Sequence, residues 1–279
     1  MLNSSLSLEQ IRTAAPSVFA ESPWEKMSDK YRFVPTIEPV TALLNAGFVV
    51  VSARQATTRI EGKGEFTRHV LRFRQAAGMK QLAERHTPGQ HTFINDGPIV
   101  PELVLLNSHD GTSAYKLMLG MFRMVCSNGL IVCNGMIDEV KARHSGRNSL
   151  VQEVIDGSFR VIGGADQAME QVQSWQAKQL TDGQQLAYAT AALELRESKI
   201  KPDPIKLLSA RRTADAGSNL WTTFNRVQEN IIRGGLGTHH TNAAGRRTWR
   251  HTRAVKSVNE DVKFNRALWK LTEELAKAV

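Results

Sequence analysis

The sequence predicts an α+β fold, with a twisted, mainly antiparallel β-sheet in the N-terminal half and a helical C-terminal half packed on it. Two periodicities lead to this class. Between residues 47 and 74, apolar and polar residues alternate as they do in strands with one buried face. From residue 150 onward, apolar residues recur at helical spacing. Because the two patterns occupy separate halves, we expect strands and helices to be segregated.

The composition is that of a globular protein. The chain has 279 residues, of which 41% are hydrophobic and 23% charged, enough for one large domain or two modest ones. No apolar run is long enough to span a membrane, and the first 20 residues lack the basic start and apolar core of a leader peptide. We therefore expect a cytoplasmic protein with no membrane partner. Its two cysteines, Cys126 and Cys133, fit no zinc-site spacing, so we expect free thiols and no cofactor.

The net charge is strongly positive. Lys and Arg number 36 against 27 Asp and Glu, which gives a formal charge of +9. Such a field attracts polyanions, and nucleic acid is the leading candidate partner. A solubilising excess of charge without a ligand is the alternative, and the position of the charge along the chain has to decide between them.

The chain is expected to have three segments. Residues 1–45 form a polar N-terminal arm and a docking segment, with a short helix from Leu6 to Ile11. Residues 46–148 form a β-rich core. Residues 149–279 form a helical region that contains a basic loop over residues 234–258.

A β-hairpin is predicted over residues 47–74, with its turn at Glu61–Glu65. In its second strand, Arg68, Arg72 and Arg74 share one face. A row of guanidinium groups on a sheet is a plausible track for a phosphate backbone, because each group can bind phosphate oxygens in a bidentate manner. An ordinary solvated face that carries charges is the alternative.

The next strand pair surrounds a polar turn. The apolar run Leu103–Leu106 predicts a strand buried on both sides, and a returning strand is predicted over Tyr115–Leu119. Between them, the Asp110-Gly111 pair is typical of a hairpin turn. His109 in this turn is a possible base or metal ligand, although a lone histidine in a turn is usually neither.

A second polar turn follows at Cys126–Gly129. We expect a short helix over Gly120–Ser127, with Gly129 as its C-terminal cap. Arg123 either anchors the first turn or offers its donors to an anion, and anchoring is favoured. The two turns are interpreted as a structural motif that comprises Asn107, Ser108, His109, Asp110, Gly111, Arg123, Cys126, Ser127, Asn128 and Gly129.

Candidate metal ligands are few. The nearest supply of carboxylates and imidazoles is His109, Asp110, Asp138, Glu139 and His144, whose spacing follows no metal-binding rule. The basic residues of the same region favour phosphate contact over catalysis; they are Lys141, Arg143, His144 and Arg147.

Helices are expected to fill the C-terminal half. Apolar spacing and end signals predict them over residues 150–180 with a break at Gly163-Gly164, over 182–198, in a short turn that starts at Lys201–Pro204, over Asn219–Ile232 and over Asn259–Ala278.

The basic loop over residues 234–258 is the strongest nucleic-acid signal. It has no acidic residue and carries Arg246, Arg247, Arg250 and Arg253 around Trp249. Arginines bind phosphates, and a tryptophan can stack on an unpaired base. A flexible loop whose Trp249 docks on the core is the alternative.

Three stretches carry a family resemblance. NSHDGTSAYKLMLGMFRMVCSNGL, QENIIRGGL and TRAVKSVNEDVKFNRALWKLTEELA resemble the phage/plasmid-like protein family, domain of unknown function 932. The resemblance spans most of the chain and implies a mobile genetic element, such as a prophage or plasmid, where single-stranded DNA is often handled. It implies no catalytic residues.

Three functions remain open. The first is a nucleic-acid-binding protein, such as a single-stranded DNA annealing or recombination accessory factor that assembles into homo-oligomers, and it is favoured over an enzyme. The second is a nuclease that uses His109 and Asp110 with a divalent metal, the one case in which a cofactor is expected. The third is a protein that binds a host protein through its basic loop.

Overall fold

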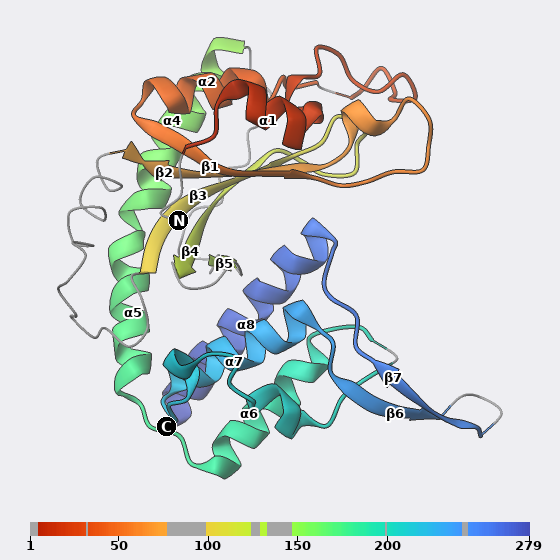
Figure 1. The fold of residues 1–279 in the computed structure, drawn as a ribbon. Helices are drawn as coiled ribbons and strands as arrows, with labels where there is room; N and C mark the ends of the chain where they lie inside the picture. The colour runs from red at the N-terminus through yellow and green to blue at the C-terminus, as the bar shows by residue number, and fades with distance from the viewer. Residues whose placement is uncertain are drawn as a thin grey trace. The chain divides into compact units, whose positions relative to one another are not determined.

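The structure is a computed structural model that describes residues 5–31, 33–76, 99–123, 129–132, 147–198, 200–241 and 245–279. It confirms the α+β class, with an antiparallel sheet in the N-terminal half and helices in the C-terminal half (Figure 1). The chain divides into two compact units. The first comprises Met1–Phe93, Val100–Phe122 and Gly135–Ala165, and the second comprises Ile94–Ile99, Arg123–Asn134 and Asp166–Val279.

The first unit begins with helices that cover the start of the sheet. Helix α1 (Leu8–Ala14) is capped by Ser7, whose side chain accepts from the Gln10 backbone while the Gln10 side chain accepts from the Ser7 backbone. It is followed by η1 (Pro16–Phe19) and α2 (Ile37–Asn45). The sequence did not predict α2. Pro39 lies in its first turn, where a missing N–H costs no helical hydrogen bond.

Four strands of the first unit follow one another in the sheet as they do in the chain. They are β1 (Phe48–Gln55), β2 (His69–Gln75), β3 (Ile99–Asn107) and β4 (Lys116–Arg123), with η2 (Gly64–Phe66) before β2. Strand β2 pairs antiparallel with both β1 and β3, and a bulge interrupts the β1 register between Val50 and Ser52. The predicted hairpin over residues 47–74 is thereby confirmed.

The hydrophobic core of the first unit is built on the strands of the sheet. Leu103–Leu106 is buried throughout, as the continuous apolar run predicts. Helix α4 (Arg147–Gly163) packs against α2, and its Phe159 ring lies 5.9 Å from the ring of Phe48.

The predicted helix over Gly120–Ser127 is wrong for its first residues. Gly120–Arg123 continues β4, because an apolar run of this length satisfies a buried strand as well as a helix. Residues 124–128 lie outside the described part of the chain. Gly129, the expected cap, begins β5 (Gly129–Val132) in the second unit, where β5 packs against α8 (Val258–Ala278).

The second unit is helical, as predicted. It contains α5 (Ala165–Ala177), α6 (Asp182–Glu194), η3 (Pro204–Leu208), η4 (Thr213–Asp215), α7 (Leu220–Arg233) and α8. Thr181, Asn219 and Ser257 cap α6, α7 and α8 through their side-chain oxygens. The aromatic centre of the core is formed by Trp175, Trp221, Phe224 and Trp269.

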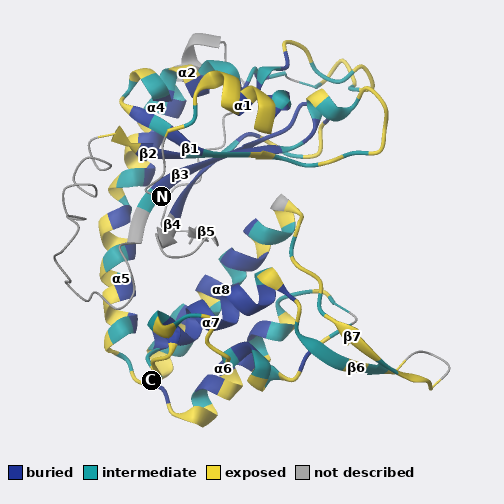
Figure 2. Ribbon diagram, in the orientation of Figure 1, coloured by how far each residue is buried: buried dark blue, intermediate teal, exposed yellow. Residues whose placement is uncertain are grey.

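Helix α7 is buried on its polar side as well as its apolar side (Figure 2). Asn230 donates to the Leu207 carbonyl at 2.9 Å, and Arg212 donates to Glu229 at 2.7 Å. These bonds fix η3 and the start of η4 to α7.

The predicted basic loop is instead a two-stranded antiparallel hairpin, β6 (Gly237–Thr241) and β7 (Arg247–His251). Figure 1 shows it extending beyond the helices of its own unit. The sequence hid it because neither of its faces is buried, so no apolar alternation marks its strands. No helix in the described part of the chain is long and apolar enough to cross a bilayer.

Candidate nucleic-acid interface

The base of the β6–β7 hairpin depends on glycine. Gly234 ends α7 with φ +64°, and a Cβ there would lie 2.6 Å from the carbonyl carbon of Arg253. Two backbone hydrogen bonds join the residues before β6 to the residue after β7. The Gly235 N–H donates to the Thr252 carbonyl at 2.8 Å, and the Thr252 N–H donates to the Leu236 carbonyl at 2.9 Å. The strands therefore leave the helical core at a fixed place.

Three cationic side chains clamp this base to the helices of the second unit. Lys206 Nζ donates to the Gly237 carbonyl at 2.5 Å. Arg211 donates to the Gly234 carbonyl at 2.9 Å, and Arg196 donates to the Arg253 carbonyl at 2.8 Å. Charged donors make stronger hydrogen bonds than neutral ones, so the hairpin root is held firmly.

The strand register divides the hairpin into two faces. His239 pairs with Trp249, Thr241 with Arg247, and Gly237 with His251. Side chains alternate along a strand and paired residues share a face. The tryptophan face therefore comprises Gly237, His239, Thr241, Arg247, Trp249 and His251. The opposite face comprises Thr238, His240, Thr248 and Arg250.

Trp249 is exposed but firmly seated. Its side chain lies on Gly237, where a Cβ would come within 2.3 Å of the ring. The rings of His239 and His251 meet it edge-on at centroid distances of 4.8 and 6.2 Å, and Lys206 Nζ lies 5.2 Å from its centroid. Even so, Trp249 is 53% exposed, so part of its side chain is open to solvent.

The hairpin and the residues beside it carry exposed positive charge. Arg246, Arg247, Arg250 and Arg253 are all exposed. In the part of the chain that the structure describes, the side chains of Arg247, Arg250 and Arg253 form no hydrogen bond or ion pair. The segment 234–258 has no carboxylate. The guanidinium groups of Arg247, Arg250 and Arg253 can therefore bind an anionic partner at little cost.

The arginines of β2 are arranged differently from the expected phosphate track. Arg72 and Arg74 each donate to Glu102 at 2.5 Å, and both Glu102 and Arg74 are buried. Glu102 reaches them because Phe73 pairs with Leu103, which places Arg74 beside Glu102 across β2 and β3. Arg72 and Arg74 thus neutralise a buried carboxylate instead of facing solvent. Arg68, the residue before β2, donates to the Thr112 carbonyl, so none of these three arginines belongs to the candidate interface.

The turn between β3 and β4 contains a buried polar network. His109 Nε2 lies 3.2 Å from Thr36 Oγ1, which lies 2.8 Å from His69 Nε2 and accepts from Asn107 at 2.9 Å. Burial lowers the pKa of His69 to about 3 and that of His109 to about 4. Ser108 Oγ accepts from the Ser113 N–H at 2.8 Å, so this network holds the turn's shape.

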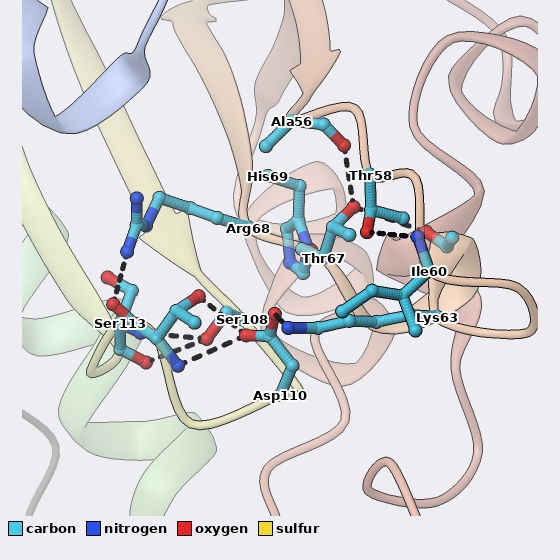
Figure 3. A network of polar contacts seen from close by, with 12 residues as sticks. Ala56, Thr58, Ile60, Lys63, Thr67, Arg68, His69, Ser108, Asp110 and Ser113 are labelled. Carbon is cyan, nitrogen blue, oxygen red and sulfur yellow. Dashed lines mark hydrogen bonds and ion pairs between the residues drawn. The ribbon is translucent and has the colours of Figure 1, made fainter.

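Asp110 closes the turn at its edge. Figure 3 shows its carboxylate against Lys63, at 3.1 Å, and it also accepts from the Thr112 N–H at 3.0 Å. Desolvation by burial acts to raise the pKa of Asp110. The hydrogen bonds that the carboxylate accepts, above all from the Thr112 side chain, outweigh this effect and keep the pKa below its usual value. Gly111 follows with φ +73°, a conformation that glycine adopts without the strain that a side chain would bring.

The nuclease residues are not assembled among the described residues, which contain no group of three or more His, Cys, Asp or Glu able to hold a metal ion. His109 is fully buried and Asp110 is ion-paired. The other predicted residues lie outside the described part of the chain: Cys126, Ser127, Asn128, Cys133, Asp138, Glu139, Lys141, Arg143 and His144. Only the backbone is described for Arg123, Gly129 and Arg147.

Sequence reasoning missed the clamp. Lys206, Arg211 and Arg196 lie far along the chain from the carbonyls they bind, and no spacing rule links them. The sequence also gives no sign that His239 belongs to the site, because its pairing with Trp249 becomes visible only once β6 and β7 are recognised as paired strands.

Comparison with known proteins identifies the family. The family described as "Domain of unknown function (DUF932)" matches residues 23–269. The chain belongs to this family. Two relatives from Escherichia coli (strain K12), UPF0380 protein YafZ and UPF0380 protein YfjQ, are each 41% identical over 272 residues, which cover 97% of this chain and 91% of each relative. A search of solved structures found no significant match. The family resemblance inferred from three sequence stretches is thus confirmed. The names of the family and of these two relatives state no activity.

Proposed function

We propose that this DUF932 protein binds nucleic acid through the β6–β7 hairpin and acts as a DNA-handling accessory factor of a mobile genetic element. The observation that carries the proposal is the combination of uncompensated guanidinium groups with a half-exposed, firmly seated Trp249 on a projecting hairpin.

Electrostatics supports a polyanionic partner. Arg247, Arg250 and Arg253 have no carboxylate to neutralise, whereas arginines elsewhere in the described chain, such as Arg74 and Arg212, are paired with buried glutamates. Phosphate contacts of this kind give affinity that falls steeply with salt and carry little sequence information.

Trp249 favours a single strand over a duplex. Bases in a duplex are stacked on one another and present only their edges, whereas an unpaired base offers its face to an aromatic ring. Single-stranded DNA binding or annealing, as in recombination, fits this preference and the mobile-element context that the sequence motifs imply.

Equilibrium binding to labelled oligonucleotides tests the proposal. Replacement of Arg246, Arg247 and Arg250 together by Ala is expected to weaken binding of a single-stranded oligonucleotide at least about tenfold at low salt. The matched control removes three exposed lysines of α8 (Lys263, Lys270 and Lys277) and is expected to change the affinity little. Equal losses in both variants would mean that net charge, and not the hairpin, drives binding.

The same titration addresses the nuclease alternative. With Mg²⁺ or Mn²⁺ present, the products are separated on a gel. Intact oligonucleotide is expected. Cleavage that disappears on replacement of Asp110 by Ala, with folding retained, would support the nuclease instead.

A further inference from the structure

We infer that nucleic acid contacts only the tryptophan face of the hairpin, that an unpaired base stacks on Trp249 while Arg247 binds a neighbouring phosphate, and that Lys206 is the residue that positions the ring. The inference rests on the proposed function and specifies how its substrate is held.

Arg247 and Trp249 are matched to one nucleotide unit. They are two residues apart on β7, so they share a face and their Cα atoms are separated by about 6.8 Å. In a nucleic-acid strand, a base and a neighbouring phosphate are separated by a similar distance. A strand that stacks one base on Trp249 therefore brings a phosphate to the guanidinium of Arg247.

The tryptophan face is built around the ring. Gly237 supplies the space that any Cβ would fill, and His239 and His251 border the ring edge-on. These contacts restrict the rotamers of Trp249 before any ligand arrives, which reduces the entropy lost on binding.

The opposite face lacks such a platform. Thr238 Oγ1 donates to the Lys201 carbonyl at 3.0 Å, and Thr248 Oγ1 donates to the His240 carbonyl at 3.3 Å. The hydroxyl groups of both threonines are thus occupied by backbone carbonyls. Arg250 carries the same charge as Arg247 but has no exposed tryptophan beside it.

Lys206 joins the ring to the helical core. It belongs to η3, which Asp203 caps, and its Nζ binds the Gly237 carbonyl while lying near the Trp249 ring. Because Lys206 Nζ donates to the Gly237 carbonyl, it holds the β6 backbone under the ring, and we assign it a positioning role and not that of a phosphate ligand.

A charge-matched pair of variants tests the one-sided contact in the full chain. The probe is a labelled oligothymidine. Arg247→Ala and Trp249→Ala are each expected to weaken binding at least about fivefold, whereas Arg250→Ala changes it less than about twofold. Trp249→Phe, which keeps an aromatic face, is expected to recover most of the loss.

Equal losses for Arg247→Ala and Arg250→Ala would overturn the one-sided contact while the proposed function stands. No binding by the unaltered protein at low salt would overturn the proposed function itself.

Lys206→Met tests the positioning role through two readouts, the preference for bases over abasic sites and the salt slope. Loss of a phosphate contact would change these two readouts differently. The substitution keeps most of the aliphatic stem and removes the charge. We expect the unaltered protein to prefer oligothymidine to its abasic counterpart at least about fivefold, and we expect Lys206→Met to lose this preference with an unchanged salt slope. A salt slope reduced by about one, with the preference for bases retained, would show a phosphate ligand and overturn the role.

Discussion

At the scale of single residues, the hydrogen bonds of buried His69 indicate which ring nitrogen carries its proton. His69 Nδ1 lies 3.2 Å from the Thr67 carbonyl, which can only accept, and 2.9 Å from Ser17 Oγ, whose hydroxyl donates to Gln55. A proton on Nδ1 satisfies both contacts. His69 Nε2 and His109 Nε2 lie 2.8 and 3.2 Å from Thr36 Oγ1. Burial disfavours the charged form and lowers the pKa of both rings, so both are neutral near pH 7.

This arrangement predicts acid sensitivity. Burial lowers the pKa of His69 to about 3 and that of His109 to about 4, from an unfolded value of 6.5. The unfolded chain thus binds more protons, and the stabilisation is complete above pH 6.5 and is lost as the pH falls toward these lowered values. Each histidine contributes about 1.4 kcal/mol per pH unit within that window.

Urea unfolding at pH 7.5 and pH 5.5 measures this loss. His109→Gln keeps a donor near the Nε2 position and removes one titrating group, so its free energy of unfolding should depend less on pH than that of the unaltered protein. The same pH dependence in both proteins would exclude a contribution from His109.

The ion triad around Glu102 makes a second prediction at this scale. Glu102→Gln leaves Arg72 and Arg74 without their counter-charge in a buried position and should lower the free energy of unfolding by about 3 kcal/mol. The control is Glu197→Gln, which breaks an exposed pair with Lys263 and should cost less than about 0.5 kcal/mol. Similar costs in denaturant titrations of both variants would refute the assignment of a buried triad.

At the scale of elements, the helices of the C-terminal half followed from the sequence, whereas helix α2 and the β6–β7 hairpin did not. Helix α8 and helix α7 bury apolar stripes that period analysis detects, and their caps Ser257 and Asn219 are recognisable locally. Hairpin β6–β7 has no buried face, and its clamps come from distant residues. The strand character of Gly120–Arg123 was missed because short apolar runs fit both a strand and a helix.

The hairpin root gives an element-scale prediction. Gly234 and Gly235 both have positive φ, so an alanine at either position costs about 1 to 2 kcal/mol in backbone strain. Only at Gly234 does the new Cβ meet the Arg253 backbone, at 2.6 Å, whereas at Gly235 it meets nothing within 4 Å. Gly234→Ala should therefore destabilise the protein by at least about 1 kcal/mol more than Gly235→Ala. Thermal unfolding of the two variants provides the comparison, and equal losses would show that the root is not tightly packed.

At the scale of the whole molecule, the formal charge of +9 indicated a polyanionic partner without locating its site. Arg72 and Arg74 share the strand face that the sequence predicts, but they serve Glu102, because a carboxylate on the neighbouring strand lies within their reach. Arg247, Arg250 and Arg253 have no such neighbour among the described residues. Alternation predicts which side chains share a face, whereas only strand pairing shows which charges are already neutralised.

The salt dependence of single-stranded DNA binding, measured by fluorescence anisotropy, tests the interface for the unaltered protein and for the variant with Arg246, Arg247 and Arg250 replaced by Ala. We expect the logarithm of the affinity to fall linearly with the logarithm of salt concentration, and we expect the variant to lower the slope by about one for each phosphate contact removed. An affinity that is independent of salt, or an identical slope in both proteins, would contradict a nucleic-acid interface on the β6–β7 hairpin.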